Sequence, residues 1–113
     1  MASLYQTRKV TRVIIEYIRY TISPGADVAF EEAYQKAQAF LKGSTHCLGY
    51  ELARCIEDPQ NYVLRILWDS LDGHEKGFRT SSEFPQFLGL VRPYLDATKE
   101  MHHYEATSIK WKS

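Results

Sequence analysis

The chain has 113 residues, and its 14 Lys and Arg balance 14 Asp and Glu, so the formal net charge is zero. This length supports one hydrophobic core, and the balanced charge argues against a nucleic-acid partner, which usually selects a basic excess. The hydrophobic fraction of 44% and charged fraction of 25% are typical of a folded domain. The apolar runs are too short to span a membrane, and residues 1–12 lack the apolar segment of a secretory signal. We therefore expect no membrane partner and no export.

Two cysteines, Cys47 and Cys55, fall within one predicted strand. On that strand they would lie roughly 26 Å apart, whereas a disulfide needs Cα atoms within about 7 Å. Two free thiols and no export signal predict a cytoplasmic protein. Adjacent residues of a strand point to opposite faces, so neither His46 with Cys47 nor His102 with His103 offers two ligands on one side. No zinc-type spacing is present, and we expect no metal site.

The first predicted elements are a strand and a helix. Residues 13–22 are rich in β-branched and aromatic side chains and predict a strand, which Ser23-Pro24-Gly25 ends with turn-forming residues. Residues 26–42 then change to the helical period and end at Lys42-Gly43. The face that we expect to be buried carries Ala26, Phe30, Ala33, Ala37, Phe40 and Leu41.

A hairpin follows. Residues 46–56 and 62–69 predict two strands, and the short turn between them contains Pro59, which cannot continue a strand ladder. The shortness of the link predicts that the two strands are antiparallel.

The last third of the chain predicts two helices and a strand. Ser70 can cap a short helix from Leu71 to about Arg79. A second helix is predicted over residues 83–92, with Pro93 closing it, and residues 98–108 predict a more polar strand. The apolar stripe of the second helix is Phe84, Phe87, Leu88 and Val91.

The predicted order is β-α-β-β-α-β, with the second helical region broken in two. This order predicts a ferredoxin-like α+β fold, in which the first and third strands are central and helices cover one face of an antiparallel sheet. We expect a single domain over residues 13–108, with tails at 1–12 and 109–113. Both faces of the two central strands are largely apolar, so the uncovered face would expose an apolar patch. This predicts a homodimer with sheets packed together; the alternative is scattered apolar residues left in solvent.

Several stretches of residues 13–105 are informative in their order and spacing. They are Ser23-Pro24-Gly25, Phe30, His46 to Glu51, Val63 to Ser70, His74, Phe78 and Ser82-Glu83-Phe84. Together they resemble the antibiotic biosynthesis monooxygenase (ABM) family of dimeric α+β barrel proteins. The resemblance implies homodimers with a pocket between each sheet and its helices. It also implies oxidation of aromatic, quinol or polyketide substrates by molecular oxygen, often without metal, flavin or haem, so we expect no cofactor.

The sequence matches the family at some positions and departs from it at others. Trp68 stands where the family has a tryptophan at the end of the third strand. A histidine common in the family would fall near Gly77, whereas here His74 lies about one helical turn earlier, on nearly the same face. The residues used by the haem-degrading branch fall near Ile18 and Leu88, which cannot perform those roles. Haem degradation is therefore the weaker alternative.

Oxygenation without a cofactor needs a dry pocket, an aromatic surface and a group that ionises a phenol or quinol, since a phenolic hydroxyl has a pKa of about 10. Histidine suits this task, and we predict His74 as the base and Trp68 as the stacking wall. The alternatives are an exposed surface histidine and an ordinary core tryptophan. His102 and His103 alternate on the last strand, so one of them faces inward.

The remaining predicted substrate contacts are Tyr20, Ile66, Phe78 and His103. Arg65 faces away from Trp68 and could pair with Glu16 or Glu51. No Ser-His-Asp set, phosphate-binding loop or dinucleotide fingerprint is present, which argues against hydrolase, kinase and dehydrogenase functions. The leading hypothesis is a cofactor-independent monooxygenase acting on a small aromatic molecule. The alternative is a non-catalytic dimeric barrel that binds small molecules or serves a stress response.

Overall fold

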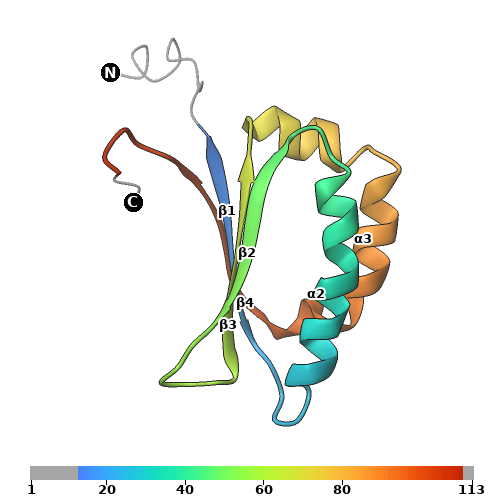
Figure 1. Cartoon of the computed structure of the whole chain (residues 1–113), viewed down its shortest axis with the longest axis vertical. Helices are drawn as coiled ribbons and strands as arrows, with labels where there is room; N and C mark the ends of the chain where they lie inside the picture. Colours follow the sequence, from blue (N-terminus) through green and yellow to red (C-terminus); the bar gives the residue numbers. More distant parts are fainter. Residues whose placement is uncertain (1–12, 111–113) are drawn as a thin grey trace.

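An antiparallel sheet of four strands forms one layer of the protein, and helices form the second layer (Figure 1). The structure is a computed structural model that describes residues 13–110; the predicted tail at 1–12 lies outside these residues. The strand order is β2-β3-β1-β4, so the first and third strands are central, as predicted. The strands are β1 (Ile14–Thr21), β2 (Cys47–Arg54), β3 (Asn61–Trp68) and β4 (Thr98–Glu105).

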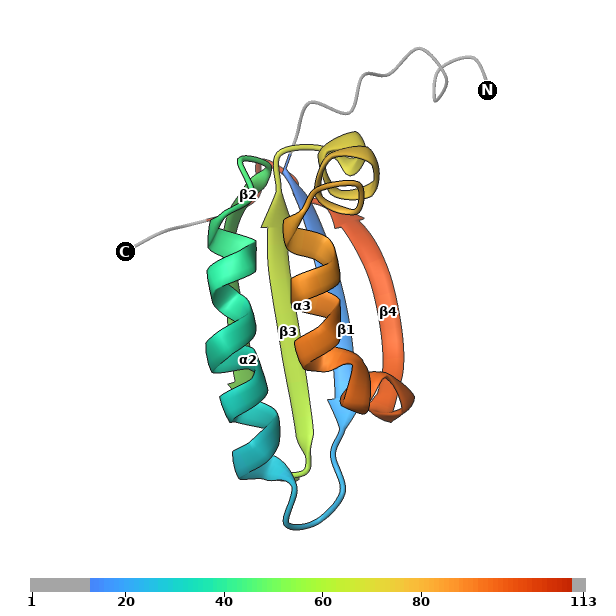
Figure 2. The same cartoon turned by 90° about the vertical axis from the view of Figure 1, so that its right-hand side faces the viewer.

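The helices all lie on one face of the sheet (Figure 2). They are α2 (Asp27–Lys42), the π-helical turn η1 (Gly73–Phe78), α3 (Glu83–Val91) and the 3-10 turn η2 (Arg92–Ala97). The predicted α+β, ferredoxin-like architecture is confirmed. One detail differs: Pro93 does not end the helical path but lies in the first turn of η2, where its missing N–H costs nothing.

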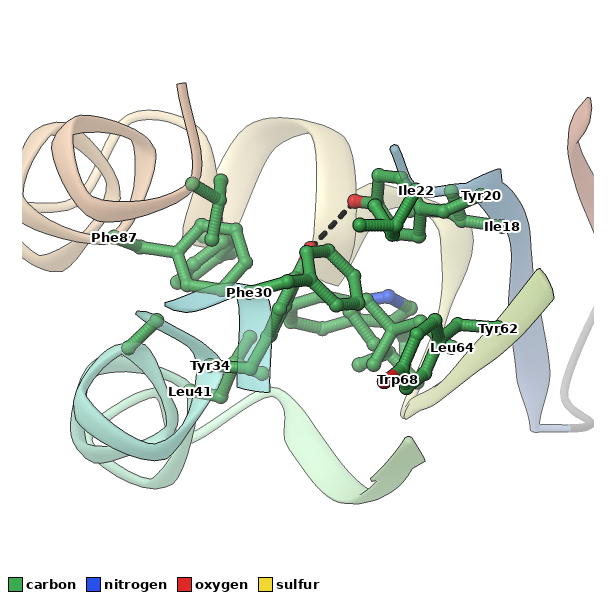
Figure 3. Packing of buried hydrophobic residues seen from close by; sticks show 14 of the residues in the cluster. Ile18, Tyr20, Ile22, Phe30, Tyr34, Leu41, Tyr62, Leu64, Trp68 and Phe87 are labelled. Carbon is green, nitrogen blue, oxygen red and sulfur yellow. Dashed lines mark hydrogen bonds between the residues drawn. The ribbon is translucent and has the colours of Figure 1, made fainter. Parts of the chain in front are cut away.

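The core lies between the sheet and the helices because the two central strands alternate strictly. Every second residue of β1 and β3 is buried beneath the helices, while the residues between them are half-buried. From α2 the core receives Phe30, Tyr34, Ala37 and Leu41. Tyr34 was absent from the predicted stripe, and the expected Ala33 and Phe40 are only half-buried. Figure 3 shows Phe30 and Tyr34 reaching from α2 toward Tyr20 and Tyr62 of the sheet.

The opposite face of the sheet carries no helix (Figure 1). Ile15, Tyr17, Val63 and Leu67 are half-buried there, and the ring of Tyr104 packs edge-on against Tyr17 at 6.1 Å. Arg65 also lies on this face.

Of the two predicted partners of Arg65, the structure selects Glu51, whose Oε1 lies 2.7 Å from Nη1 of Arg65. Glu16 faces the core instead. Both Cys47 and Cys55 are free thiols. Within residues 13–110, no helix is long and apolar enough to cross a membrane.

Candidate active site

A cavity of about 310 Å³ lies between the sheet and the helices α3, η1 and η2. This volume is at the lower end of the range typical of small-molecule sites. Most of its wall is apolar, and the polar groups that line it include Glu16, Tyr20, Tyr34 and His74. The apolar part includes Ile18, Ile66, Phe78, Phe87, Leu88 and Met101.

Five of the six predicted site residues line this cavity: Tyr20, Ile66, Trp68, His74 and Phe78. The sixth, His103, does not line it but reaches His74 from β4. The structure therefore brings the six predicted residues together at or beside one cavity. The sequence pattern alone could not establish this proximity, because the residues come from different elements. Ile18 and Leu88, at the positions where the haem-degrading branch uses other residues, also line the cavity.

Trp68 and His74 form a stacked pair at one end of the cavity. Their rings are 4.6 Å apart and nearly parallel, with an interplanar angle of 17°. Trp68 is fully buried, and His74 is only 3% exposed, so the interpretation of His74 as a surface histidine is wrong. Phe78 also packs against Trp68, at 5.1 Å. His74 and Phe78 therefore both pack against the indole of Trp68, and the stacked contact holds the His74 ring in place.

Glu16 is one of the cavity residues that the sequence analysis missed. It lies in the middle of β1 on the buried side and is 4% exposed. Its Oε1 accepts a hydrogen bond from the indole N–H of Trp68 at 3.1 Å and lies 3.3 Å from Nε2 of His74. The signal was available, because strand alternation places Glu16 between the buried Ile14 and Ile18. A carboxylate on an otherwise apolar strand face is unusual enough to indicate a site.

Burial changes the proton affinity of both groups. It raises the pKa of Glu16, with opposing contributions from the Trp68 hydrogen bond and the nearby Arg79 charge. Burial, together with the nearby charges of Arg79 and His103, lowers the pKa of His74 to about 4. At neutral pH the imidazole of His74 is therefore uncharged.

The β4 register decides which of the paired histidines faces inward. His103 lies opposite Glu16 in the β1–β4 ladder, and its Nε2 is 3.0 Å from Nδ1 of His74. His102 pairs with Tyr17 and lies on the outer face near Tyr104. Burial lowers the pKa of His103 as well. His103 therefore contacts His74 without lining the cavity, and its predicted contact with a substrate stays a prediction.

The turn η1 aims His74 at Trp68, and two glycines make this path possible. Ser70 Oγ accepts the backbone N–H of Gly73 at 2.8 Å, which is the capping role predicted for it. A Cβ at Gly73 would overlap Asp69, and one at Gly77 would overlap the ring of His46. His46 Nδ1 is in turn 2.9 Å from Asp69 Oδ2. A side chain at position 77, where the family pattern predicts histidine, would therefore have to displace His46.

A second polar group lies further along the cavity wall. The hydroxyl groups of Tyr20 on β1 and Tyr34 on α2 are 2.5 Å apart, as the dashed line in Figure 3 shows. Burial is the main cause that raises the pKa of each phenol. Both hydroxyls therefore stay protonated at neutral pH. One O–H donates to the other oxygen, which leaves the second O–H to donate a hydrogen bond to a ligand oxygen.

Glu16, His74 and His103 also constitute a possible metal-ligand set, with one ligand atom from each within 4.8 Å of the others. Two imidazoles and a carboxylate suit zinc or iron. However, His74 uses one ring nitrogen toward Glu16 and the other toward His103. The observed arrangement is therefore a chain of direct contacts, in which His103 Nε2 lies 3.0 Å from His74 Nδ1 and His74 Nε2 lies 3.3 Å from Glu16 Oε1.

The buried His74 should make stability depend on pH. The unfolded chain binds a proton to this histidine below its usual pKa of 6.5, whereas the folded protein does so only near 4. We therefore expect the free energy of unfolding to decrease between about pH 6.5 and 4, by up to ~3 kcal/mol. The raised pKa of Glu16 acts in the opposite direction over part of this range and offsets some of the loss. Urea titrations at several pH values should show a smaller decrease for His74→Gln; an equal decrease would contradict the prediction.

The fold places this chain among the ferredoxin-like α+β proteins, with a cavity between the sheet and the helices. The profile described as antibiotic biosynthesis monooxygenase matches residues 13–89. The chain belongs to the antibiotic biosynthesis monooxygenase family.

Three relatives illustrate how far this similarity extends. The uncharacterized protein YczJ of Bacillus subtilis is 27% identical over 84 residues, covering 74% of this chain and 88% of YczJ. A Bordetella bronchiseptica structure, provisionally described as an antibiotic biosynthesis monooxygenase, is 29% identical with a TM-score of 0.74, covering 85% of this chain and 98% of that one. SnoaB of Streptomyces nogalater, a cofactor-independent oxygenase, has a TM-score of 0.66 at 19% identity, covering 88% and 96%. The last of these shows a shared fold.

Proposed function

We propose that this protein is a cofactor-independent monooxygenase that oxidises a small aromatic, quinol or polyketide-like molecule with molecular oxygen. The observation that carries the proposal is the largely apolar cavity with the Glu16–His74 pair at its wall. An apolar cavity holds an aromatic ring, and a buried acid–base pair can take the proton of its hydroxyl group. The shared fold of SnoaB supports the same function.

The chemistry asks little of the protein beyond these features. Removal of a proton leaves an electron-rich substrate anion, which is the species that can reduce oxygen. A dry cavity strengthens the electrostatic interactions of the acid–base pair and keeps water from competing. The Tyr20–Tyr34 hydroxyl pair can hold a second oxygen of the substrate away from the reacting end.

The test combines oxygen uptake with a variant that narrows the cavity. Leu95 lines the cavity and is 43% exposed, whereas Leu71 is similarly exposed, at 40%, and lies away from it. With a panel of quinols and phenols, Leu95→Trp should raise KM by about tenfold or more, equivalent to ~1.4 kcal/mol of binding. Leu71→Trp should match the wild type.

Two results would count against this function. Quinols that bind the wild-type protein without any oxygen uptake would favour the non-catalytic binding protein. Equal kinetics for Leu95→Trp and Leu71→Trp would place the reaction outside this cavity.

The uncovered face of the sheet supports a homodimer as the working unit. Its row of half-buried apolar side chains, with Tyr17 and Tyr104 packed together, would be costly to leave in water. Two copies packed sheet to sheet would cover it in both. Sedimentation at micromolar concentration should give about twice the 13.1 kDa of one chain. A particle that stays monomeric at high concentration would refute the dimer.

The free thiols of Cys47 and Cys55 support a reducing compartment, and we place the enzyme in the cytoplasm.

A further inference from the structure

We propose that Glu16, rather than His74, is the group that exchanges a proton with the bound substrate, and that His74 and His103 position its carboxylate. This inference rests on the proposed oxygenase function for its purpose. The supporting observations are the contacts of Glu16, His74 and His103, which do not depend on that function. Glu16 would then be the catalytic residue of the site, and the two histidines would be positioning residues.

The two oxygens of Glu16 have different surroundings. Both contacts of the carboxylate converge on Oε1, which receives the Trp68 N–H and faces His74 Nε2. Within residues 13–110, no group donates a hydrogen bond to Oε2. Oε2 is also not one of the fully buried side-chain oxygens without a partner, so it is not completely enclosed by protein atoms. Since Glu16 lines the cavity, Oε2 is the oxygen available to a ligand there.

His74, by contrast, has no ring nitrogen left for a substrate. Its Nε2 faces Glu16, its Nδ1 faces His103, and one ring face is stacked on Trp68. One assignment of hydrogens suits both contacts: His103 donates its Nε2–H to Nδ1 of His74, which leaves the hydrogen of His74 on Nε2, 3.3 Å from Oε1 of Glu16. In this arrangement the imidazole presents an N–H to the carboxylate and has no free lone pair.

The acid–base properties of the two groups agree with this division. Burial weakens His74 as a base, because its pKa falls to about 4. The same burial strengthens Glu16 as a base, because its pKa is raised toward the neutral range in which a general base works best. The other charged groups nearby are Arg79, which acts on Glu16 and both histidines, and Glu75, which acts on His103.

The proton balance of the step is simple. The substrate O–H bond breaks, its proton forms a bond to Oε2 of Glu16, and the electron pair stays on the substrate. The substrate anion adds to molecular oxygen through a ring carbon that carries hydrogen and becomes a peroxide anion. Glu16 returns the proton to that peroxide. Loss of water across the C–H and O–O bonds then leaves a carbonyl group and an ionised Glu16.

The experiment separates the two candidate bases without depending on oxygen chemistry. The probe is 4-nitrophenol, whose ionised form absorbs visible light and whose neutral form does not. At a pH where the free probe is mostly neutral, binding to the wild-type protein should produce the phenolate band. Glu16→Gln should bind the probe without the band, and Glu32→Gln, the same change on the exposed face of α2, should behave as the wild type.

His74→Gln is the decisive variant. The glutamine amide can donate a hydrogen bond to Glu16 but cannot accept a proton near neutral pH. We expect His74→Gln to keep the phenolate band and to shift the pH at which it forms, because the donor to Glu16 has changed. With an oxidisable quinol, Glu16→Gln should lower kcat by about 10²–10⁴-fold and His74→Gln by much less.

The outcomes are distinct. A His74→Gln protein that loses the band as fully as Glu16→Gln would overturn the inference, as would a Glu16→Gln protein that keeps it. Stoichiometric binding of added Zn²⁺ or Fe²⁺ by wild type, lost in Glu16→Gln, would replace it by a metal site. Glu16-dependent ionisation of the probe without oxygen uptake on any quinol would leave the inference standing and refute the proposed oxygenase function.

Discussion

Replacing His74 by Ala is expected to lower the rate of aromatic oxidation near neutral pH by about 10²–10⁴-fold, because the proton acceptor Glu16 loses the group that positions it. The loss would follow from the geometry of the site. Without the imidazole, Glu16 keeps only the hydrogen bond from Trp68, and the space beside the indole opens to water. Steady-state oxygen uptake with a quinol substrate measures the effect. The decrease should appear mainly in kcat, because the acid–base pair acts in the transition state.

The double variant Glu16→Gln/His74→Ala sharpens this test. Residues that act as one unit lose their function together, so the double variant should be little slower than the slower single variant. His102→Ala is the matched control, since His102 is adjacent to His103 in the sequence yet lies on the opposite face of β4. A folded His74→Ala protein that turns over at the wild-type rate would remove His74 from the reaction.

Replacing Phe30 by Ala is expected to destabilise the fold by about 3–5 kcal/mol, a large part of the stability of a domain of this size. Phe30 is fully buried, and its ring packs against four tyrosines at centroid distances between 4.8 and 5.3 Å. These are Tyr20, Tyr34, Tyr62 and Tyr94. Truncation removes both the buried apolar area and the edge-to-face contacts, and it leaves a void that rigid neighbours fill poorly.

Phe40 offers a comparison on the same helix. It carries the same side chain but is only half-buried, so Phe40→Ala should cost clearly less. Urea unfolding at neutral pH measures both losses. If Phe30→Ala lowered the free energy of unfolding no more than Phe40→Ala does, the aromatic cluster around Phe30 would not be a main source of the core's stability.

Local sequence patterns were sufficient to predict the strands and helices and their order along the chain. The two-residue period of β1 and β3 reports directly which side chains face the helices, because a strand places neighbours on opposite faces. Pro59 and Gly25 mark turns through backbone restrictions that act within a few residues. Gly25, with a φ of 85°, adopts a conformation that other residues rarely reach. Such signals are local and can be interpreted without knowing the rest of the molecule.

The site was only partly accessible to the same reasoning. Trp68 and His74 are close in sequence, so a helix after a strand could be expected to bring them together. Tyr34 was missed because a tyrosine on a helix is compatible with either a core or a surface position, and its hydroxyl finds a partner only on another element, at Tyr20. Glu16 was misassigned as a possible partner of Arg65, although its position in the alternation already placed it on the other face.

By itself, the sequence determined the β-α-β-β-α-β order, the central strands and the face of the sheet that the helices cover, because each depends on short-range periodicity and turn chemistry. Only the tertiary structure decided that Glu16, His74 and His103 form one chain of contacts. Those residues come from β1, η1 and β4, and their meeting depends on strand register and on the path of η1 past His46. A shift of one residue in β4 would have placed His102 there instead, and no local pattern fixes that register.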